Sequence, residues 1–306
     1  MRYRIGWAGA LALSIIFSLG TAAPVRAQKI ALTVDDLPET GDLPPDMSRA
    51  QIAARITKAL KDAHAPQVYG FVNAGTLDDP DVAHLLERWR AAGFLLGNHT
   101  WSHYSADEKP LAVYERDIAR NEPVLRKLMV GQDWHWFRYP FLAEGATLER
   151  RVAIRKYLSD HGYKIAEVTI DFEDHAFNDP YARCIAKGDN ASIVRMHTLY
   201  MDAAKESIRL SRARSQMLFH REISYVMLLH FGSFEAVMLP QLLDLLKQQG
   251  FTLVTLPEAQ ADPVYALDPG MVNDGGTFLD DLMQASTMDD APHPELPTPI
   301  LEKMCK

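Results

Sequence analysis

Seven short apolar segments alternate along this chain with amphipathic helices, and this alternation limits the fold more than any other feature. The segments lack the in–out polarity of a half-exposed sheet, so both of their faces are expected to be buried. Such strands predict a parallel sheet, closed or nearly closed into a barrel, with the helices packed around it. The strands are predicted at 29–34, 67–72, 94–96, 134–139, 163–170, 225–229 and 251–255.

Apolar stripes with helical spacing predict the helices between these strands. The helices are predicted at 48–63, 81–92, 111–129, 147–159 and 236–249. Pro123 is expected to kink or divide the third of them.

Two stretches stand outside the alternation. The charged, largely helical insertion 178–221 joins the fifth and sixth strands. We expect it to cover part of a substrate groove and to set substrate choice, as long loops at a barrel rim often do. The tail 262–306 is rich in Asp, Pro and Gly, so we expect it to wrap around the barrel or to be partly disordered.

Polar side chains gather at the carboxyl ends of the predicted strands, where α/β barrels form their active sites. His99 and His103 are four residues apart and would point at one spot if their segment turned helically. With one of Asp35 and Asp36 they make two imidazoles and a carboxylate, the ligand set of a hydrolytic metal site with open positions. The other aspartate would then lie beside the metal as a general base.

Five short motifs in this order resemble those of the polysaccharide deacetylases, the NodB-homology or carbohydrate esterase 4 family. The first two together are specific, and the last three would be weak alone. The resemblance covers roughly 29–256 and implies a distorted (β/α)7 barrel, with the helical insertion before the last strands. The motifs are Thr33-Val34-Asp35-Asp36, His99-Thr100-Trp101-Ser102-His103, Arg138-Tyr139-Pro140-Phe141, Asp171-Phe172-Glu173-Asp174-His175 and Leu228-Leu229-His230.

The resemblance also implies a role for each polar motif residue. Asp35 would be the general base and His230 the general acid, with Arg138 orienting Asp35 and Asp174 pairing with His230. Asp171 is a weaker candidate than Asp174 for that pairing. One divalent metal is implied, for which Zn²⁺ suits the ligands and Co²⁺, Ni²⁺ and Mn²⁺ are alternatives. Its ligands would be Asp36, His99 and His103.

Substrate contacts are implied at four further residues. The backbone N–H of Phe141 would be the oxyanion donor, because Pro140 before it has no N–H. Phe141 stands where the family has Tyr, and His175 stands where it has Trp, which alters one wall of the acetyl pocket. Leu228 and Trp101 complete the predicted substrate-binding set, although Trp101 could equally be a core residue.

These motifs predict a metal-dependent hydrolase that removes N-acetyl groups from an amino-sugar polymer or oligosaccharide, such as chitin, peptidoglycan or poly-N-acetylglucosamine. Two alternatives stay open. One is an O-acetyl esterase acting on a xylan-like polymer, and the other is a non-catalytic carbohydrate-binding envelope protein on the same fold. The net charge of −8 argues against a nucleic-acid partner, which favours a basic face.

The N-terminal residues 1–27 predict a signal peptide. Arg2 and Arg4 precede an apolar run over 8–17, and Val25-Arg26-Ala27 offers a cleavage site before Gln28. The mature barrel domain would then be 28–261, exported to a periplasm or secreted, without stable membrane insertion. In an oxidising compartment Cys184 and Cys305 would either pair and pin the tail or remain two free thiols.

Overall fold

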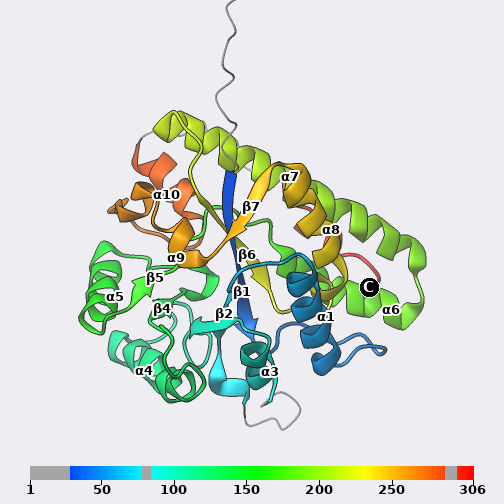
Figure 1. Cartoon of the computed structure of the whole chain (residues 1–306), viewed down its shortest axis with the longest axis horizontal. Coiled ribbons are helices and arrows are strands. Elements are labelled where there is room, and N and C mark those ends of the chain that lie inside the picture. Colours follow the sequence, from blue (N-terminus) through cyan, green and yellow to red (C-terminus); the bar gives the residue numbers. More distant parts are fainter. Residues whose placement is uncertain (1–27, 78–83, 287–294) are drawn as a thin grey trace, which may run out of the picture.

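The computed structural model describes residues 28–77, 84–286 and 295–306, so the predicted signal peptide lies outside the described residues. Its centre is a curved, seven-stranded sheet of parallel strands in the order β5-β4-β3-β2-β1-β6, with β7 also paired to β1. Helices surround this sheet (Figure 1), and the predicted distorted α/β barrel is confirmed. The strands are β1 (Gln28–Leu37), β2 (Tyr69–Val72), β3 (Leu95–Asn98), β4 (Trp136–Phe137), β5 (Lys164–Ile165), β6 (Tyr225–His230) and β7 (Phe251–Val254).

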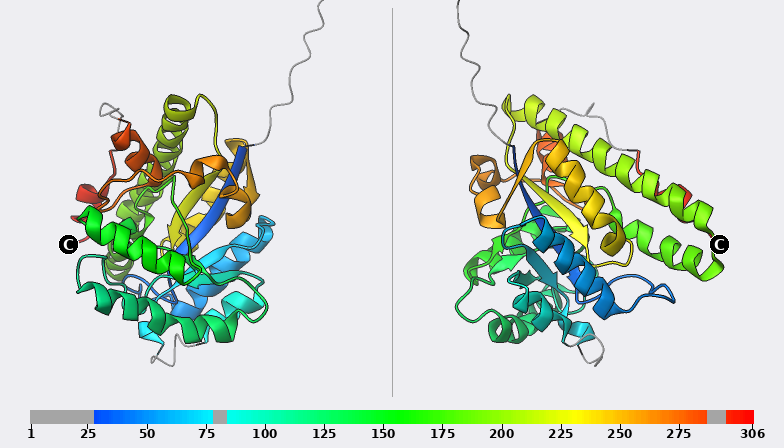
Figure 2. Two further views of the ribbon diagram at one scale, coloured as in Figure 1. Left: turned by 90° about the vertical axis from the view of Figure 1, so that its left-hand side faces the viewer. Right: turned by 45° about the vertical axis from the view of Figure 1, so that its right-hand side comes forward.

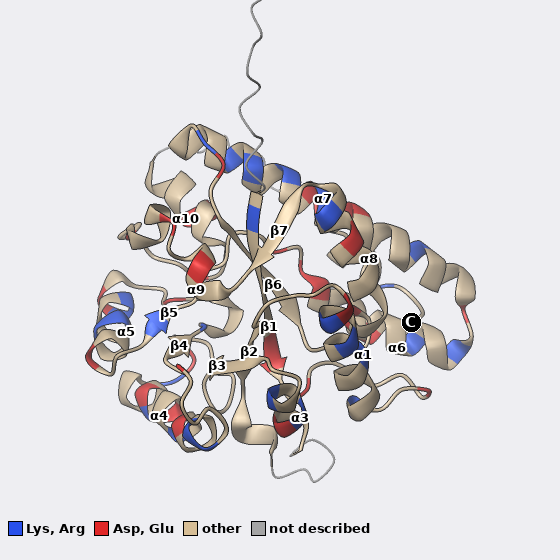
Figure 3. Ribbon diagram, in the orientation of Figure 1, with Lys and Arg blue, Asp and Glu red and all other residues tan. Residues whose placement is uncertain are grey.

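Strand β1 is the longest strand and the centre of the sheet. Its one edge pairs with β6, and its other edge pairs first with β7 and then with β2. Asp35, near its carboxyl end, lies directly across from His230 on β6. Figure 3 shows the acidic carboxyl end of β1 in the middle of the molecule. The parallel register therefore brings the predicted base and the predicted acid to the same edge.

The segment that begins with β5 closes the barrel because it pairs with two different strands. Its start pairs with β4, and five residues later Ile170 bridges to Met227 of β6. The N–H groups of Thr169 and Ile170 donate to Val226 O at 3.0 and 3.1 Å. The predicted continuous strand 163–170 is therefore divided, because its two ends pair with opposite edges of the sheet.

Five helices follow the strands as predicted. They are α1 (Arg49–Asp62), α3 (Leu85–Ala91), α4 (Leu111–Leu128), α5 (Leu148–Asp160) and α8 (Glu235–Gln248). The start of the helix predicted at 81–92 lies partly outside the described residues. Helix α4 continues through Pro123, so Pro123 does not divide it. Buried Ile118 and Leu125 on either side of Pro123 anchor the helix to the core, which offsets the missing backbone hydrogen bond.

The insertion forms two helices, α6 (Asn178–Lys187) and α7 (Asn190–Phe219), which lie along one flank of the molecule (Figure 2). The cleft identified below gives no support to the expectation that the insertion covers the substrate groove. No residue of 178–221, all of which the structure describes, lines the cleft identified below. A connection between two parallel strands leaves the sheet at its carboxyl edge and must return at its amino edge. Helix α7 therefore runs away from the carboxyl edge, where the predicted site lies. Its inner face is instead core, with Tyr200 and Ile208 buried.

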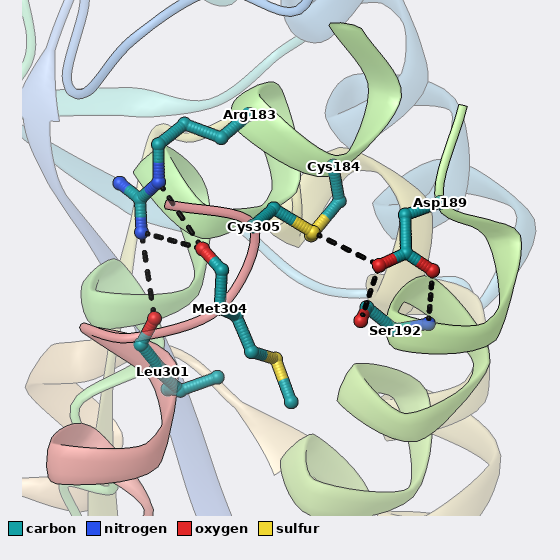
Figure 4. The surroundings of a disulfide bond; sticks show 7 residues. All are labelled: Arg183, Cys184, Asp189, Ser192, Leu301, Met304 and Cys305. Atoms are coloured by element: carbon teal, nitrogen blue, oxygen red, sulfur yellow. Dashed lines mark hydrogen bonds between the residues drawn. A yellow bond between two sulfur atoms is a disulfide. The ribbon is translucent and has the colours of Figure 1, made fainter. Parts of the chain in front are cut away.

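The tail packs against the barrel through short helices. It contains α10 (Phe278–Ala285), whose Phe278 and Leu279 are buried, and α11 (Thr298–Leu301). A short α9 (Leu256–Ala259) precedes it. Cys184 and Cys305 form a disulfide across 121 residues of sequence (Figure 4). Beside it Arg183 donates to the carbonyl oxygens of Leu301 and Met304, so the chain end is held to α6.

Candidate metal centre and active site

The predicted ligands converge at the carboxyl edge of the sheet. Asp36 Oδ1 lies 3.4 Å from His99 Nε2 and 3.2 Å from His103 Nε2. One ligand atom from each of the three residues lies within 4.8 Å of the others, which is close enough to hold one metal ion. The histidines converge without the expected helical turn. They lie in a loop after β3, in which Thr100 and His103 have φ of 64° and 55°.

The three residues fit a divalent cation in their chemistry as well as their spacing. Asp36 Oδ1 is buried without a hydrogen-bond donor, an unfavourable state that a cation would relieve. His99 Nδ1 lies 2.8 Å from Arg138 O, to which only a protonated Nδ1 can donate, so its Nε2 lone pair faces Asp36. Burial, and after it the neighbouring His99, lowers the pKa of His103 to about 4, which favours a neutral ligand.

Burial acts to raise the pKa of Asp36, but its neighbours outweigh that effect. Its close neighbours His99, His230 and His103 hold the pKa well below its usual range. Asp36 is therefore a carboxylate at any physiological pH, as a metal ligand must be.

Buried polar side chains that the sequence did not single out hold the histidine loop in place. Asn98 Oδ1 accepts from Thr100 N at 2.9 Å and from Asn121 Nδ2 at 3.0 Å. Asp117 accepts from both the N–H and the hydroxyl of Ser102, each at 2.9 Å. Their only sequence signal is polarity on otherwise buried faces of β3 and α4, and that is common in unrelated proteins.

Asp35 is held by Arg138, as predicted. Arg138 is buried and its Nη1 lies 3.1 Å from Asp35 Oδ2, while its Nη2 donates to Thr33 Oγ1 at 3.0 Å. The backbone oxygen of the same residue accepts from His99, as described above. One buried arginine therefore orients the predicted base with its side chain and a predicted metal ligand with its carbonyl.

His230 is held by Asp174 rather than by Asp171. Its Nδ1 lies 2.8 Å from Asp174 Oδ1, and its backbone N–H donates to Asp174 Oδ2 at 2.7 Å. Burial acts to lower the pKa of His230, but the charge and hydrogen bond of Asp174 outweigh it and raise the pKa to about 10. Asp171 instead accepts from Glu173 N at 2.9 Å, and burial raises its pKa.

The loop after β4 brings Phe141 against His103, one of the predicted metal ligands. The Phe141 ring centroid lies 4.6 Å from that of His103. Phe141 and Leu142 have φ of 60° and 56°, a left-handed conformation that costs free energy in side chains with a Cβ. Asp36, Thr100, His103 and Glu173 share this conformation, so six of the nine described non-glycine residues with positive φ lie at the site.

These groups open into one cleft of about 380 Å³. Of the residues predicted to bind substrate, His175 and Leu228 line this cleft. Trp101 instead lines an adjoining cavity of about 440 Å³, which shares Asp36 and His103 with the cleft. The sequence analysis assigned no role to five lining residues, two of which, Gly275 and Gly276, come from the tail. The complete lining is Asp35, Asp36, Thr40, His99, His103, Phe141, Leu142, Asp171, Glu173, His175, Leu228, His230, Gly275 and Gly276.

The fold and the site together define a class of protein: an α/β barrel with a candidate cation site at the carboxyl edge of its sheet. The carboxylate of Asp35 and the imidazole of His230 flank that site. Residues 22–166 match the sequence model of the polysaccharide deacetylase family. The match contains the first three motifs and confirms the resemblance. No protein with a curated description matches the sequence.

Solved structures of related proteins share the fold. The chitin deacetylase from the fungal pathogen Colletotrichum lindemuthianum is 23% identical, with a TM-score of 0.52 over 76% of this chain and 88% of that one. A CE4 family pseudoenzyme from Bacillus anthracis is 15% identical, with a TM-score of 0.52 over 76% of this chain and 66% of that one. At these identities the likeness concerns the fold alone.

Proposed function

We propose that the chain is a metal-dependent hydrolase that removes N-acetyl groups from an amino-sugar polymer or oligosaccharide. The observation that carries this proposal is one cleft in which a cation-ligand set, a buried carboxylate and a histidine–aspartate pair face the same space. Amide hydrolysis needs all three, because the carbonyl is a poor electrophile and the amine leaves only when protonated.

Asp36, His99 and His103 would hold one divalent cation, and Zn²⁺ suits two imidazoles and a carboxylate. A cation held there polarises the acetyl carbonyl and lowers the pKa of a water molecule toward about 7. Asp35 is the proposed base, because its Oδ2 lies 3.8 Å from His99 Nε2 and is thus beside the ligands. Arg138 fixes the orientation of that carboxylate, so the base does not compete for the position of Asp36.

His230 is the proposed acid. Its Nδ1 is bound to Asp174, which leaves Nε2 to deliver a proton into the cleft that the ring lines. A pKa of about 10 keeps the ring protonated at neutral pH before the amine departs. The amide N–H of Phe141 would stabilise the charge that develops on the carbonyl oxygen.

The side chains, rather than the fold, support an enzyme over a carbohydrate-binding protein. The Bacillus anthracis relative has a similar fold and is a pseudoenzyme, so the fold does not guarantee activity. Here Asp35, Asp36, His99, His103 and His230 are all present and all line one cleft. An acetylated carbohydrate is the proposed substrate, because the family acts on polysaccharides.

We also propose that the protein is exported after cleavage of residues 1–27, leaving a barrel domain over 28–261 and a tail over 262–306. The disulfide between Cys184 and Cys305 supports an oxidising compartment. Among the described residues, no helix combines the length and the apolar character needed to cross a membrane.

The direct test is acetyl release followed by mass spectrometry on chitooligosaccharides, peptidoglycan fragments and acetylated xylan, with metal-free and Zn²⁺-loaded protein. Loss of acetyl from amino sugars only with metal would support the proposal. Release only from xylan would indicate an O-acetyl esterase instead. No release from any substrate by metal-loaded protein would contradict an enzymatic role.

His230→Ala separates an acid from a structural residue. The variant should lose amide hydrolysis but retain most hydrolysis of an aryl acetate, because a phenolate leaves without a proton. Equal losses on both substrates would argue against the acid role.

A further inference from the structure

We propose that the tail segment 273–277, here called the tail wall, is a part of the cleft that selects the size of the acyl group. This inference rests on the proposed function and adds a specificity determinant to it. Gly275 and Gly276 of the tail wall line the same cleft as Asp35 and His230. The family match ends at residue 166, so these residues lie outside it.

The tail wall lies on the side of the cleft where the acyl group would bind. A Cβ placed on Gly275 would lie 3.2 Å from the backbone oxygen of Phe141, whose N–H is the proposed oxyanion donor. Leu228 and His175, on strand β6 and the loop before α6, line the same cleft. The carbonyl oxygen and the methyl group of an acetyl therefore have the tail wall as a neighbour.

Only glycine suits the backbone at positions 275 and 276 of the tail wall. Gly275 and Gly276 have φ of 130° and 140°, a region that residues with a Cβ almost never adopt. Without side chains, the backbone itself forms the surface of the cleft. A Cβ added at Gly275 would crowd the backbone oxygen of Phe141 and so reduce the space for the acyl group, whereas one added at Gly276 would face Asp280. Either change would also strain the backbone.

Hydrogen bonds fix the tail wall to the two loops that carry the catalytic motifs. Asn273 O accepts from both Glu144 N and Gly145 N at 3.0 Å, on the loop that follows Phe141. At its other end Phe278 N donates to Val168 O at 2.7 Å, on the chain that leads to Asp171. Phe278 is also buried. The tail wall is thus held at both ends.

The side chain of Asn273 stiffens the segment between these two anchors. Its Oδ1 accepts from Gly275 N at 2.8 Å, and its Nδ2 donates to Asp281 Oδ2 at 2.7 Å. Asn273 and Asp281 are both buried, so water cannot replace these bonds freely. Removing that side chain should loosen the wall while the backbone bonds to Glu144 and Gly145 persist.

The test compares two variants with opposite expected effects on Zn²⁺-loaded full-length protein. The substrates are N-acetyl and N-propionyl forms of one glucosamine oligosaccharide. Gly275→Ala should lower kcat/KM for propionyl at least about tenfold more than for acetyl, since its added Cβ would lie 3.2 Å from Phe141 O and one methyl group in a pocket changes discrimination by about 10–200-fold. Asn273→Ala should instead raise the ratio of kcat/KM for propionyl to kcat/KM for acetyl, because the loosened tail wall can move to admit the larger acyl group.

Gly270→Ala is the matched control, because Gly270 lies in the same tail with a φ of 66° and has no heavy atom within 4 Å of an added Cβ. It should lose some stability to strain but keep the wild-type acyl ratio. Equal loss on both acyl groups in Gly275→Ala, or an unchanged ratio in Asn273→Ala, would overturn the inference. If Gly275→Ala does not fold, Asn273→Ala alone decides. A wild-type protein inactive on both substrates would contradict the proposed function, which is a separate outcome.

Discussion

Replacing Asp174 with Asn should shift the pH dependence of catalysis in a direction that the structure fixes. Asn keeps the size of the side chain and an oxygen that can accept from the backbone N–H of His230. It removes the charge that lies 2.8 Å from His230 Nδ1 and that contributes most to raising the pKa of His230 to about 10. An opposite charge at such a distance typically shifts a pKa by about 1–3 units.

The general acid must be protonated, so activity falls as pH rises through the pKa of His230. In Asp174→Asn the alkaline limb of kcat/KM should therefore move about 1–3 units toward lower pH. The negative charge of Asp174 also stabilises the folded state through protonated His230. Because the folded-state pKa of His230 exceeds its ordinary value of 6.5, this stabilisation is complete below pH 6.5 and is lost as pH rises toward about 10.

Kinetic pH profiles of metal-loaded wild type and variant would measure the shift, with metal content checked in both. Asp171→Asn is the matched control, because Asp171 is a nearby half-buried aspartate bonded to Glu173 N rather than to His230. Asp171→Asn should move the alkaline limb of kcat/KM less than Asp174→Asn does. An alkaline limb that stays in place in Asp174→Asn, with activity retained, would refute the assignment of His230 as the acid held by Asp174.

Three further predictions concern the metal, the base and the disulfide. His103→Ala should lose most bound metal in elemental analysis, since the two remaining ligands cannot hold a tight site; full retention would contradict the ligand assignment. Asp35→Asn should keep the metal but lose about 10²–10⁴-fold in turnover, and near wild-type turnover would exclude it as the base. Cys184→Ser with Cys305→Ser should lower the free energy of unfolding by up to about 5 kcal/mol in urea titration, as expected for a loop of 121 residues. A loss below about 1 kcal/mol would show that the buried tail residues anchor it alone.

Local sequence was enough to predict the sheet and most of the motif residues. Each strand is a short apolar run, and a polar residue just after such a run must lie at the carboxyl edge of a parallel sheet. Asp36 and His99 therefore lie at the same edge, whereas His103 reaches them only through the loop after β3. The loop itself could not be predicted. It is not helical, and Thr100 and His103 hold left-handed conformations that only the buried bonds around them stabilise.

The sequence by itself determined the parallel sheet, the edge where the site lies and the chemical types that meet there, because these follow from periodicity and from positions next to strands. Only the tertiary structure decided which aspartate pairs with His230, that Cys184 meets Cys305, that α7 packs as core and that Gly275 and Gly276 line the cleft. Each of these depends on contacts between segments far apart in the chain. Such contacts are selected by the packing of the whole molecule, and no local pattern specifies them.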